Sequence, residues 1–193
     1  DTKRRDTMAI STYRENLIQT VLDNSYGNTW EEAVNEWEIT DCVEDRSRKE
    51  SCICGKEELK YLYEIHNVVT DKYLYPIGSS CITKFEREDL CEETSVAEGM
   101  FKLLHAVEQN AYLELSPDLF SRKLLRALYE RGAFVPSKFN NYDGTNDYEF
   151  MLKMFNKRDK SSITPFQEKK IKAILLNSIK PYLQKELKNK IVR

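Results

Sequence analysis

The sequence predicts an α+β protein that is mostly helical, with a small zinc-binding β-hairpin module between an N-terminal pair of helices and a C-terminal helical bundle. Apolar residues recur every three or four positions over most of the 193 residues, which is the period of amphipathic helices. The period changes to two within 59–77, as in a half-buried strand. Three cysteines flank that segment. We therefore divide the chain into 1–92, holding the first helices and the hairpin module, and 93–193, holding the bundle.

Two helices are expected before the hairpin. The first has one apolar face, formed by Ile10, Tyr13, Leu17 and Val21. The second begins at Thr29-Trp30-Glu31-Glu32, a capping box in which the Thr hydroxyl and the Glu carboxylate each accept a backbone N–H. It should run to about Glu38. Trp30 and Trp37, seven residues apart, would then share one face, a spacing that favours packing.

The hairpin follows directly. Apolar and polar residues alternate from Leu59 to His66, and a turn at 70–72 leads into a return strand over Tyr73–Ile77. Pro76 has no amide proton, so this second strand should lie at a sheet edge. A short helix, capped by Ser79 or Ser80, is expected to run to about Glu86.

The remainder is predicted to be helical. Helices should begin at Thr94 or Ser95 and at Ser116-Pro117, and the second should end at Gly132. The Asn-rich stretch 136–146 is the longest loop and a candidate linker. A further helix spans 148–155, and Thr164-Pro165 opens the last one. Phe155 on the first and Phe166 on the second stand among lysines and could stack on exposed bases, but their helical phase favours core positions. Pro181 should bend or end that helix.

The cysteine spacing points to a metal site. Cys52 and Cys54 lie at a turn before the hairpin, and Cys81 lies at the start of the short helix after it, which is the order of a treble-clef zinc site. A structural Zn²⁺ has four protein ligands. His66 is the first choice for the fourth, and Cys42 and Cys91 are alternatives. Small buried cysteines in a metal-free hairpin are the competing interpretation.

These motifs resemble a known module. The residues that match are Ala33 to Trp37, Cys52-Ile53-Cys54-Gly55, Ile65-His66-Asn67, Thr70 and Ile77-Gly78-Ser79-Ser80-Cys81-Ile82 with Phe85. Over 29–86 the chain resembles a small zinc-finger module of uncharacterised phage, prophage and mobile-element proteins, found mainly in bacteria. Residues 147–181 also resemble segments of Gram-positive phage proteins. The resemblance implies a treble-clef-like fold and a mobile-element setting, but no activity.

Charge is distributed unevenly. Residues 152–193 hold 12 Lys or Arg against 3 Asp or Glu, whereas 23–45 hold eight acidic residues and no Lys or Arg. No apolar run is long enough to span a membrane and the start is charged, so we expect a cytoplasmic protein. The resemblance to phage proteins implies a bacterial host cell. His66 and His105 are the only histidines, and no nucleophile elbow or phosphate loop occurs. We therefore expect no enzyme activity.

Two functions fit this charge pattern. The favoured one is a nucleic-acid-binding accessory protein that contacts the phosphates of DNA or RNA with basic residues of the last helices. These are Lys153, Lys157, Arg158, Lys160, Lys169, Lys170 and Lys172. The alternative is a phage-encoded inhibitor, anti-CRISPR-like, whose acidic surface binds the basic groove of a host defence nuclease. That surface would comprise Trp30, Glu31, Glu32, Glu36 and Trp37.

Overall fold

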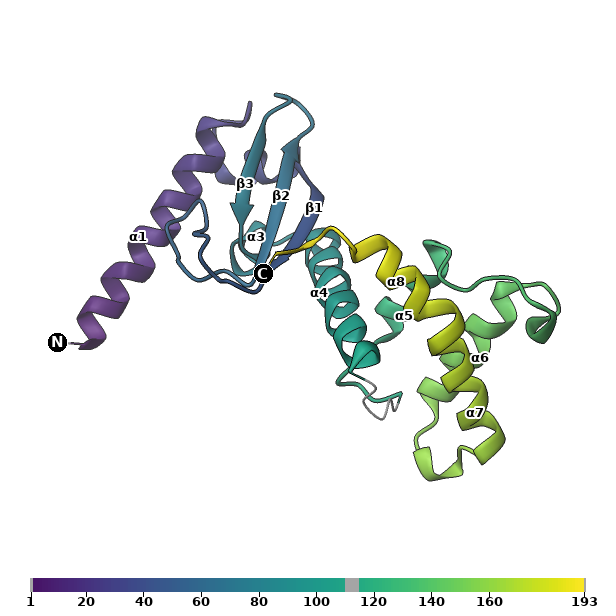
Figure 1. Cartoon of the computed structure of the whole chain (residues 1–193). Helices are drawn as coiled ribbons and strands as arrows, with labels where there is room; N and C mark the ends of the chain where they lie inside the picture. Colours follow the sequence, from purple (N-terminus) through teal and green to yellow (C-terminus); the bar gives the residue numbers. More distant parts are fainter. Residues whose placement is uncertain (1, 110–114, 193) are drawn as a thin grey trace. The chain divides into compact units, whose positions relative to one another are not determined.

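The computed structural model of the protein describes residues 2–109 and 115–192, and their side chains from residue 12 onward. The fold is α+β and mostly helical, as predicted (Figure 1). The chain divides into two compact units, Asp1–Thr94 with Lys190–Arg193, and Ser95–Asn189. The predicted boundary lay two residues earlier, and the return of the last residues to the first unit was not foreseen. Within the described residues, no helix is both long enough and apolar enough to cross a bilayer.

The first unit is built on a four-stranded sheet with the order β3-β2-β1-β4. Strand β2 pairs antiparallel with both β1 and β3, and β4 pairs parallel with the end of β1. Helices lie before and after the strands along the chain. The elements are α1 (Thr2–Asp23), α2 (Trp30–Ala33), β1 (Trp37–Asp45), β2 (Tyr61–Asn67), β3 (Tyr73–Ile77), α3 (Ser79–Ile82), α4 (Glu88–Glu108), which continues into the second unit, and β4 (Ile191–Val192).

The predicted hairpin is confirmed as β2 and β3, and β3 with Pro76 is an edge strand. The second helix begins where it was predicted, but it ends after about one turn, so the prediction that it runs to Glu38 is wrong. Its capping box forms between Thr29 and Glu32, but α2 ends at Ala33, a 3₁₀ turn follows, and Trp37 begins β1. Trp37 is 1% exposed and its Nε1 donates to Ser25 Oγ at 2.9 Å. The β-branched residues after it, Ile39, Thr40 and Val43, favour a strand, which the helical capping signal obscured.

The second unit is helical. Its elements are α5 (Arg122–Glu130), α6 (Gly144–Asn156), α7 (Pro165–Ile174), a π-helical turn (Leu175–Ile179) and α8 (Lys180–Leu187). Two predicted starts were wrong: α4 begins before Thr94, and α5 begins after Ser121, whose Oγ accepts from Leu124 N, and not at Ser116. Pro181 does not end the last helix. The π-helical turn continues directly into α8, and Pro181 lies in the first turn of that helix, where a proline is tolerated.

The predicted linker at 136–146 is ordered. A 3₁₀ turn (Lys138–Asn140) is closed by a capping box between Ser137 and Asn140, and α6 starts inside the predicted loop. Asn140 is 2% exposed, and its Nδ2 donates both to Val135 O at 2.9 Å and to Asp147 Oδ2 at 2.8 Å. The loop is therefore fixed to α6 by buried polar contacts.

Gly144 is where this loop comes closest to the preceding chain, and substitution there should be costly. A Cβ at position 144 would stand 2.1 Å from Phe134 O, a backbone atom. We expect Gly144→Ala to lower the free energy of unfolding by about 3 kcal/mol, measured by urea unfolding. A Cβ at Gly132 meets nothing within 4 Å, although its φ is +82°. Gly132→Ala should therefore cost only about 1 kcal/mol, and equal losses in the two variants would contradict the steric account.

Candidate metal centre and nucleic-acid interface

Three cysteines meet in the interior of the first unit. The Sγ atoms of Cys52, Cys54 and Cys81 lie within 4.8 Å of one another, and the side chains are 4%, 1% and 2% exposed. The Cys52 and Cys81 sulfurs are 3.6 Å apart. Around a tetrahedral Zn²⁺ with bonds of about 2.3 Å, sulfur atoms lie about 3.8 Å apart. The predicted cysteine cluster thus forms, with a spacing that could hold a metal ion.

The turn that carries two of these cysteines is tied to the sheet. Ile53 N donates to Pro76 O at 2.9 Å, which fixes the turn to edge strand β3. Gly55 has a φ of +94°, in the left-handed region, and its N–H donates to Cys52 O at 2.7 Å. The cap of α3 is Gly78, not the predicted Ser79 or Ser80. Its N–H points at Cys52 Sγ, at 3.4 Å, and thereby links α3 to the cluster.

The pKa values of the three thiols are shifted in different directions, although the thiols are neighbours. The hydrogen bond from Cys81, against the opposing effect of burial, lowers the pKa of Cys52 to about 5. Burial raises the pKa of Cys54, and the interaction with Cys52, with burial, raises the pKa of Cys81 well above its usual range. Negative charge on one buried sulfur disfavours charge on the others. A bound dication removes this conflict, because it allows all three to be thiolates.

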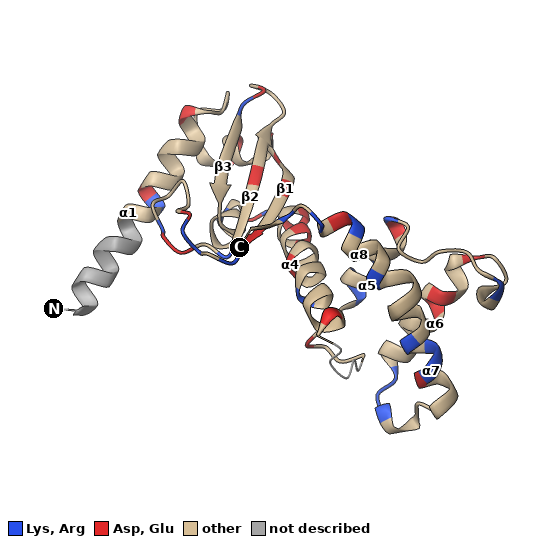
Figure 2. Ribbon diagram, viewed as in Figure 1, with Lys and Arg blue, Asp and Glu red and all other residues tan. Residues whose placement is uncertain are grey.

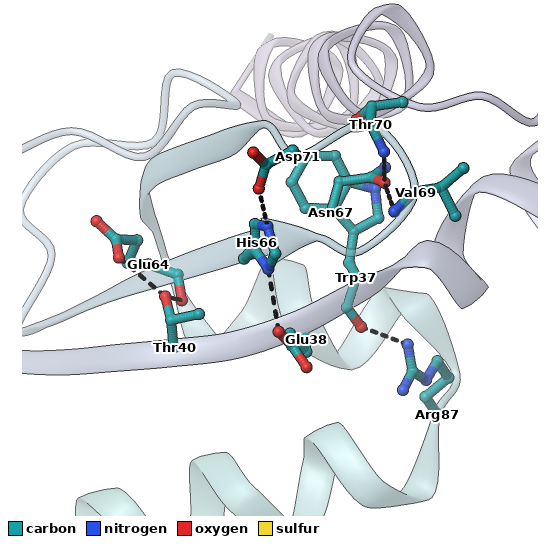
Figure 3. Close-up of polar contacts among 10 residues, drawn as sticks. All are labelled: Trp37, Glu38, Thr40, Glu64, His66, Asn67, Val69, Thr70, Asp71 and Arg87. Atoms are coloured by element: carbon teal, nitrogen blue, oxygen red, sulfur yellow. Dashed lines mark hydrogen bonds and ion pairs between the residues drawn. The ribbon is translucent and has the colours of Figure 1, made fainter.

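His66, predicted as the fourth ligand, is not part of this cluster. Its Nδ1 lies 3.0 Å from Glu38 Oε1 and its Nε2 lies 2.9 Å from Asp71 Oδ1, so carboxylates occupy both ring nitrogens (Figure 3). Hydrogen bonds that the ring donates to the carboxylates of Glu38 and Asp71 raise the pKa of His66. The ring also stacks on Tyr73, with centroids 4.5 Å apart. This histidine links β1 to the β2–β3 turn, and the prediction of a ligand role is corrected.

The two alternative cysteines also lie elsewhere. Cys42 is buried on β1, opposite Tyr63 on β2, and Cys91 is partly exposed in the first turns of α4. In the part of the chain that the structure describes, no further His, Cys, Asp or Glu joins the three clustered cysteines. The donor set therefore fits three of the four positions of a structural zinc site.

The acidic surface predicted over 23–45 is interrupted. Glu36 is 8% exposed, and its carboxylate accepts from Tyr26 N at 2.8 Å, Gly27 N at 2.6 Å and Asn67 Nδ2 at 2.7 Å. Trp37 is in the core. The prediction that Glu36 and Trp37 form a partner-binding surface is therefore wrong. Trp30 packs edge-on against Phe85, at 5.3 Å between ring centroids, and Glu31 and Glu32 are exposed.

The predicted basic residues fall into two groups. Lys157, Lys160 and Lys170 bind within the unit: Lys157 to Ser162 O and Gln167 Oε1, Lys160 to the carbonyl of Met154, and Lys170 to Asp147 Oδ1 at 3.4 Å. The other four side chains are exposed and belong to α6, to α7 and to the turn between them. These four are Lys153, Arg158, Lys169 and Lys172. Figure 2 marks the Lys and Arg positions along the ribbon in blue.

Phe166 differs from its expected placement. Its helical phase predicted a core position, but the side chain is 78% exposed in the first turn of α7. Phe155, the other aromatic of this region, is partly exposed, with Lys160 Nζ 5.3 Å from its ring centroid. Lys169 follows Phe166 by three residues, so the two lie on one exposed helix face. The exposed position of Phe166 therefore favours the alternative that the sequence had ranked second, a ring able to stack on a base.

Sequence reasoning also missed two exposed aromatics, Phe139 and Tyr142, in the segment taken for a linker. Phe139 is 82% exposed and Tyr142 74% exposed. The capping-box spacing of Ser137 and Asn140 was the available signal that this segment is ordered.

Comparison of the chain with protein-family models, with curated proteins and with solved structures finds no match to any of them. The function is therefore argued from the residues of the two candidate sites alone.

Proposed function

We propose that the protein is a zinc-stabilised, non-catalytic accessory protein of a phage or mobile element. It binds DNA or RNA in the bacterial cytoplasm through α6, α7 and the turn between them. The observation that carries the proposal is the exposed Phe166 ring, in a segment that also exposes the cations Lys153, Arg158, Lys169 and Lys172. An exposed ring beside lysines is suited to a base and its phosphate at once.

The cations of this surface account for affinity without sequence preference. Lys153, Arg158, Lys169 and Lys172 are exposed, and the second unit, 95–189, holds 16 Lys or Arg against 11 Asp or Glu. Each phosphate neutralised by such a residue releases condensed counterions, so binding should weaken steeply with salt. Such contacts position a protein on nucleic acid but do not read its bases.

Zinc has a structural role in this proposal. Cys52, Cys54 and Cys81 would hold the ion in a treble-clef-like module, and zinc would supply the stability that joins the 52–55 turn to α3. The inhibitor alternative has less support, because two of its five surface residues, Glu36 and Trp37, are internal.

Charge reversal on α7 tests the proposal. We expect Lys169→Glu with Lys172→Glu to weaken binding to a duplex DNA by at least about tenfold at low salt and to reduce the salt slope by about 2, one unit per lysine. The measurement is fluorescence anisotropy with labelled oligonucleotides. Lys49→Glu with Lys84→Glu makes the same change in net charge at two exposed positions of the first unit. An equal loss of affinity in this control would contradict a localised interface.

A further inference from the structure

The loop 135–142 of the second unit, which contains a 3₁₀ turn, presents aromatic rings outward from a hydrogen-bonded backbone. Phe139 and Tyr142 are 82% and 74% exposed, three residues apart on one turn. Rings that stay exposed to water contribute no burial to the stability of the unit. Two on one short turn therefore indicate a contact surface.

The backbone that carries these rings is ordered by polar contacts rather than by apolar packing. Ser137 N donates to Asn140 Oδ1 at 2.7 Å, and Tyr142 N donates to Ser137 O at 2.8 Å. Asn141 and Tyr142 have φ of +57° and +58°, in the left-handed region, which is unfavourable for a large side chain such as that of Tyr142. In this conformation the Tyr142 side chain is 74% exposed.

The neighbours of the rings favour a nucleic acid as the occupant. Lys138 Nζ lies 5.1 Å from the centroid of the Phe139 ring, so a cation accompanies the first aromatic. Exposed Asn141 lies between the two rings along the chain and exposed Lys138 precedes them, so the surface is not the continuous apolar patch typical of a protein interface. The unit has an excess of basic residues. Aromatic rings beside cations on such a unit are the combination that binds unpaired bases and their phosphates.

We infer that loop 135–142 is a stacking site for unpaired nucleobases, with Phe139 and Tyr142 as the stacking rings. The inference rests on the proposed nucleic-acid binding and makes it more specific: the preferred ligand is single-stranded. In a duplex the base faces are covered by neighbouring base pairs, so only the cationic surface of α6 and α7 can contribute. In a single strand both surfaces contribute, and the strand gains affinity from stacking that does not depend on salt.

The test compares a labelled thymidine oligonucleotide with a duplex of the same length, using the full chain at fixed low salt. Phe139→Ala and Tyr142→Ala should each weaken single-strand binding by about 5- to 150-fold and leave duplex binding within about twofold. Tyr142→Phe, which keeps a ring, should bind like the unaltered protein. Phe139→Leu, which keeps apolar volume without a ring, should bind like Phe139→Ala.

Tyr26 provides the matched control. It is 78% exposed, close to the exposure of the two loop aromatics, but it belongs to the first unit, where acidic residues predominate. Tyr26→Ala should leave the affinity for the single strand and the affinity for the duplex unchanged. If the unaltered protein binds single strands and the loop variants bind equally well, the stacking site is refuted while nucleic-acid binding stands. If the unaltered protein binds neither oligonucleotide, both proposals fail.

Discussion

Cys52→Ser is expected to abolish zinc binding and to unfold the sheet-containing unit. Cys52 is the member of the cluster that contacts both Cys81 Sγ and Gly78 N, at 3.6 Å and 3.4 Å. A structural zinc contributes on the order of 10 kcal/mol, comparable to the whole stability of a small domain. Zinc measured by mass spectrometry should fall from about one ion per chain to near zero, and the far-ultraviolet circular dichroism of the sheet should be largely lost.

The matched control for this experiment is Cys91→Ser, which removes a partly exposed thiol outside the cluster. It should retain both the zinc and the fold. A strong chelator added to the unaltered protein should reproduce the effect of Cys52→Ser. Full stability of the chelated protein, or of Cys52→Ser, would show that the three cysteines are small buried residues and that no metal supports the unit.

The second large effect is expected for Glu36→Ala, which should lower the free energy of unfolding in urea by about 3 kcal/mol. The substitution removes the acceptor of the Tyr26 and Gly27 amides and of Asn67 Nδ2, and Asn67 is fully buried. Donors left without partners inside a protein cost about 1–3 kcal/mol each. Glu31→Ala, at an exposed position on α2, should stay within about 0.5 kcal/mol of the parent. Similar losses for the two substitutions would refute the structural role of Glu36.

The same carboxylate gives a pH dependence. Burial raises the pKa of Glu36, but hydrogen bonds from Asn67, Tyr26 and Gly27 outweigh it and hold the pKa below its usual value of 4.5. Its contribution is therefore complete above the unfolded-state pKa and is lost as the pH falls through the lower folded-state pKa. The stability difference between parent and Glu36→Ala should shrink below about pH 4.5, which urea unfolding at several pH values would reveal.

The sequence predicted local structure where one strong signal acted alone. Alternation from Leu59 to His66 gave β2, and Thr164-Pro165 gave α7 with its capping box. It failed at Trp37, because a correct capping box at Thr29 began a helix that lasts for one turn and the buried Glu36 binds the preceding loop. A local signal marks where a helix starts, whereas its length is decided by packing partners that are distant in sequence.

The candidate metal centre was predictable because two of its cysteines lie at the turn before the hairpin and the third lies at the start of the helix after it. Cys52, Cys54 and Cys81 do meet. The role of His66 was not predictable. A histidine on a strand can face either side of a sheet. Of its two partners, Asp71 lies in the predicted turn, but Glu38 lies on β1, a strand that the sequence did not indicate. Phe166 was misplaced for a related reason: helical phase identifies a face, but not whether another element covers it.

The most direct test of the account is a salt titration of the purified, metal-quantified protein with single-stranded and duplex oligonucleotides. The account predicts binding at low salt whose affinity falls linearly with the logarithm of salt concentration, by about 0.9 of a log unit per phosphate contact on duplex DNA and about 0.7 on single strands. It also predicts tighter binding to the single strand. Absence of binding to every oligonucleotide at the lowest salt would contradict the central claim that this protein binds nucleic acid.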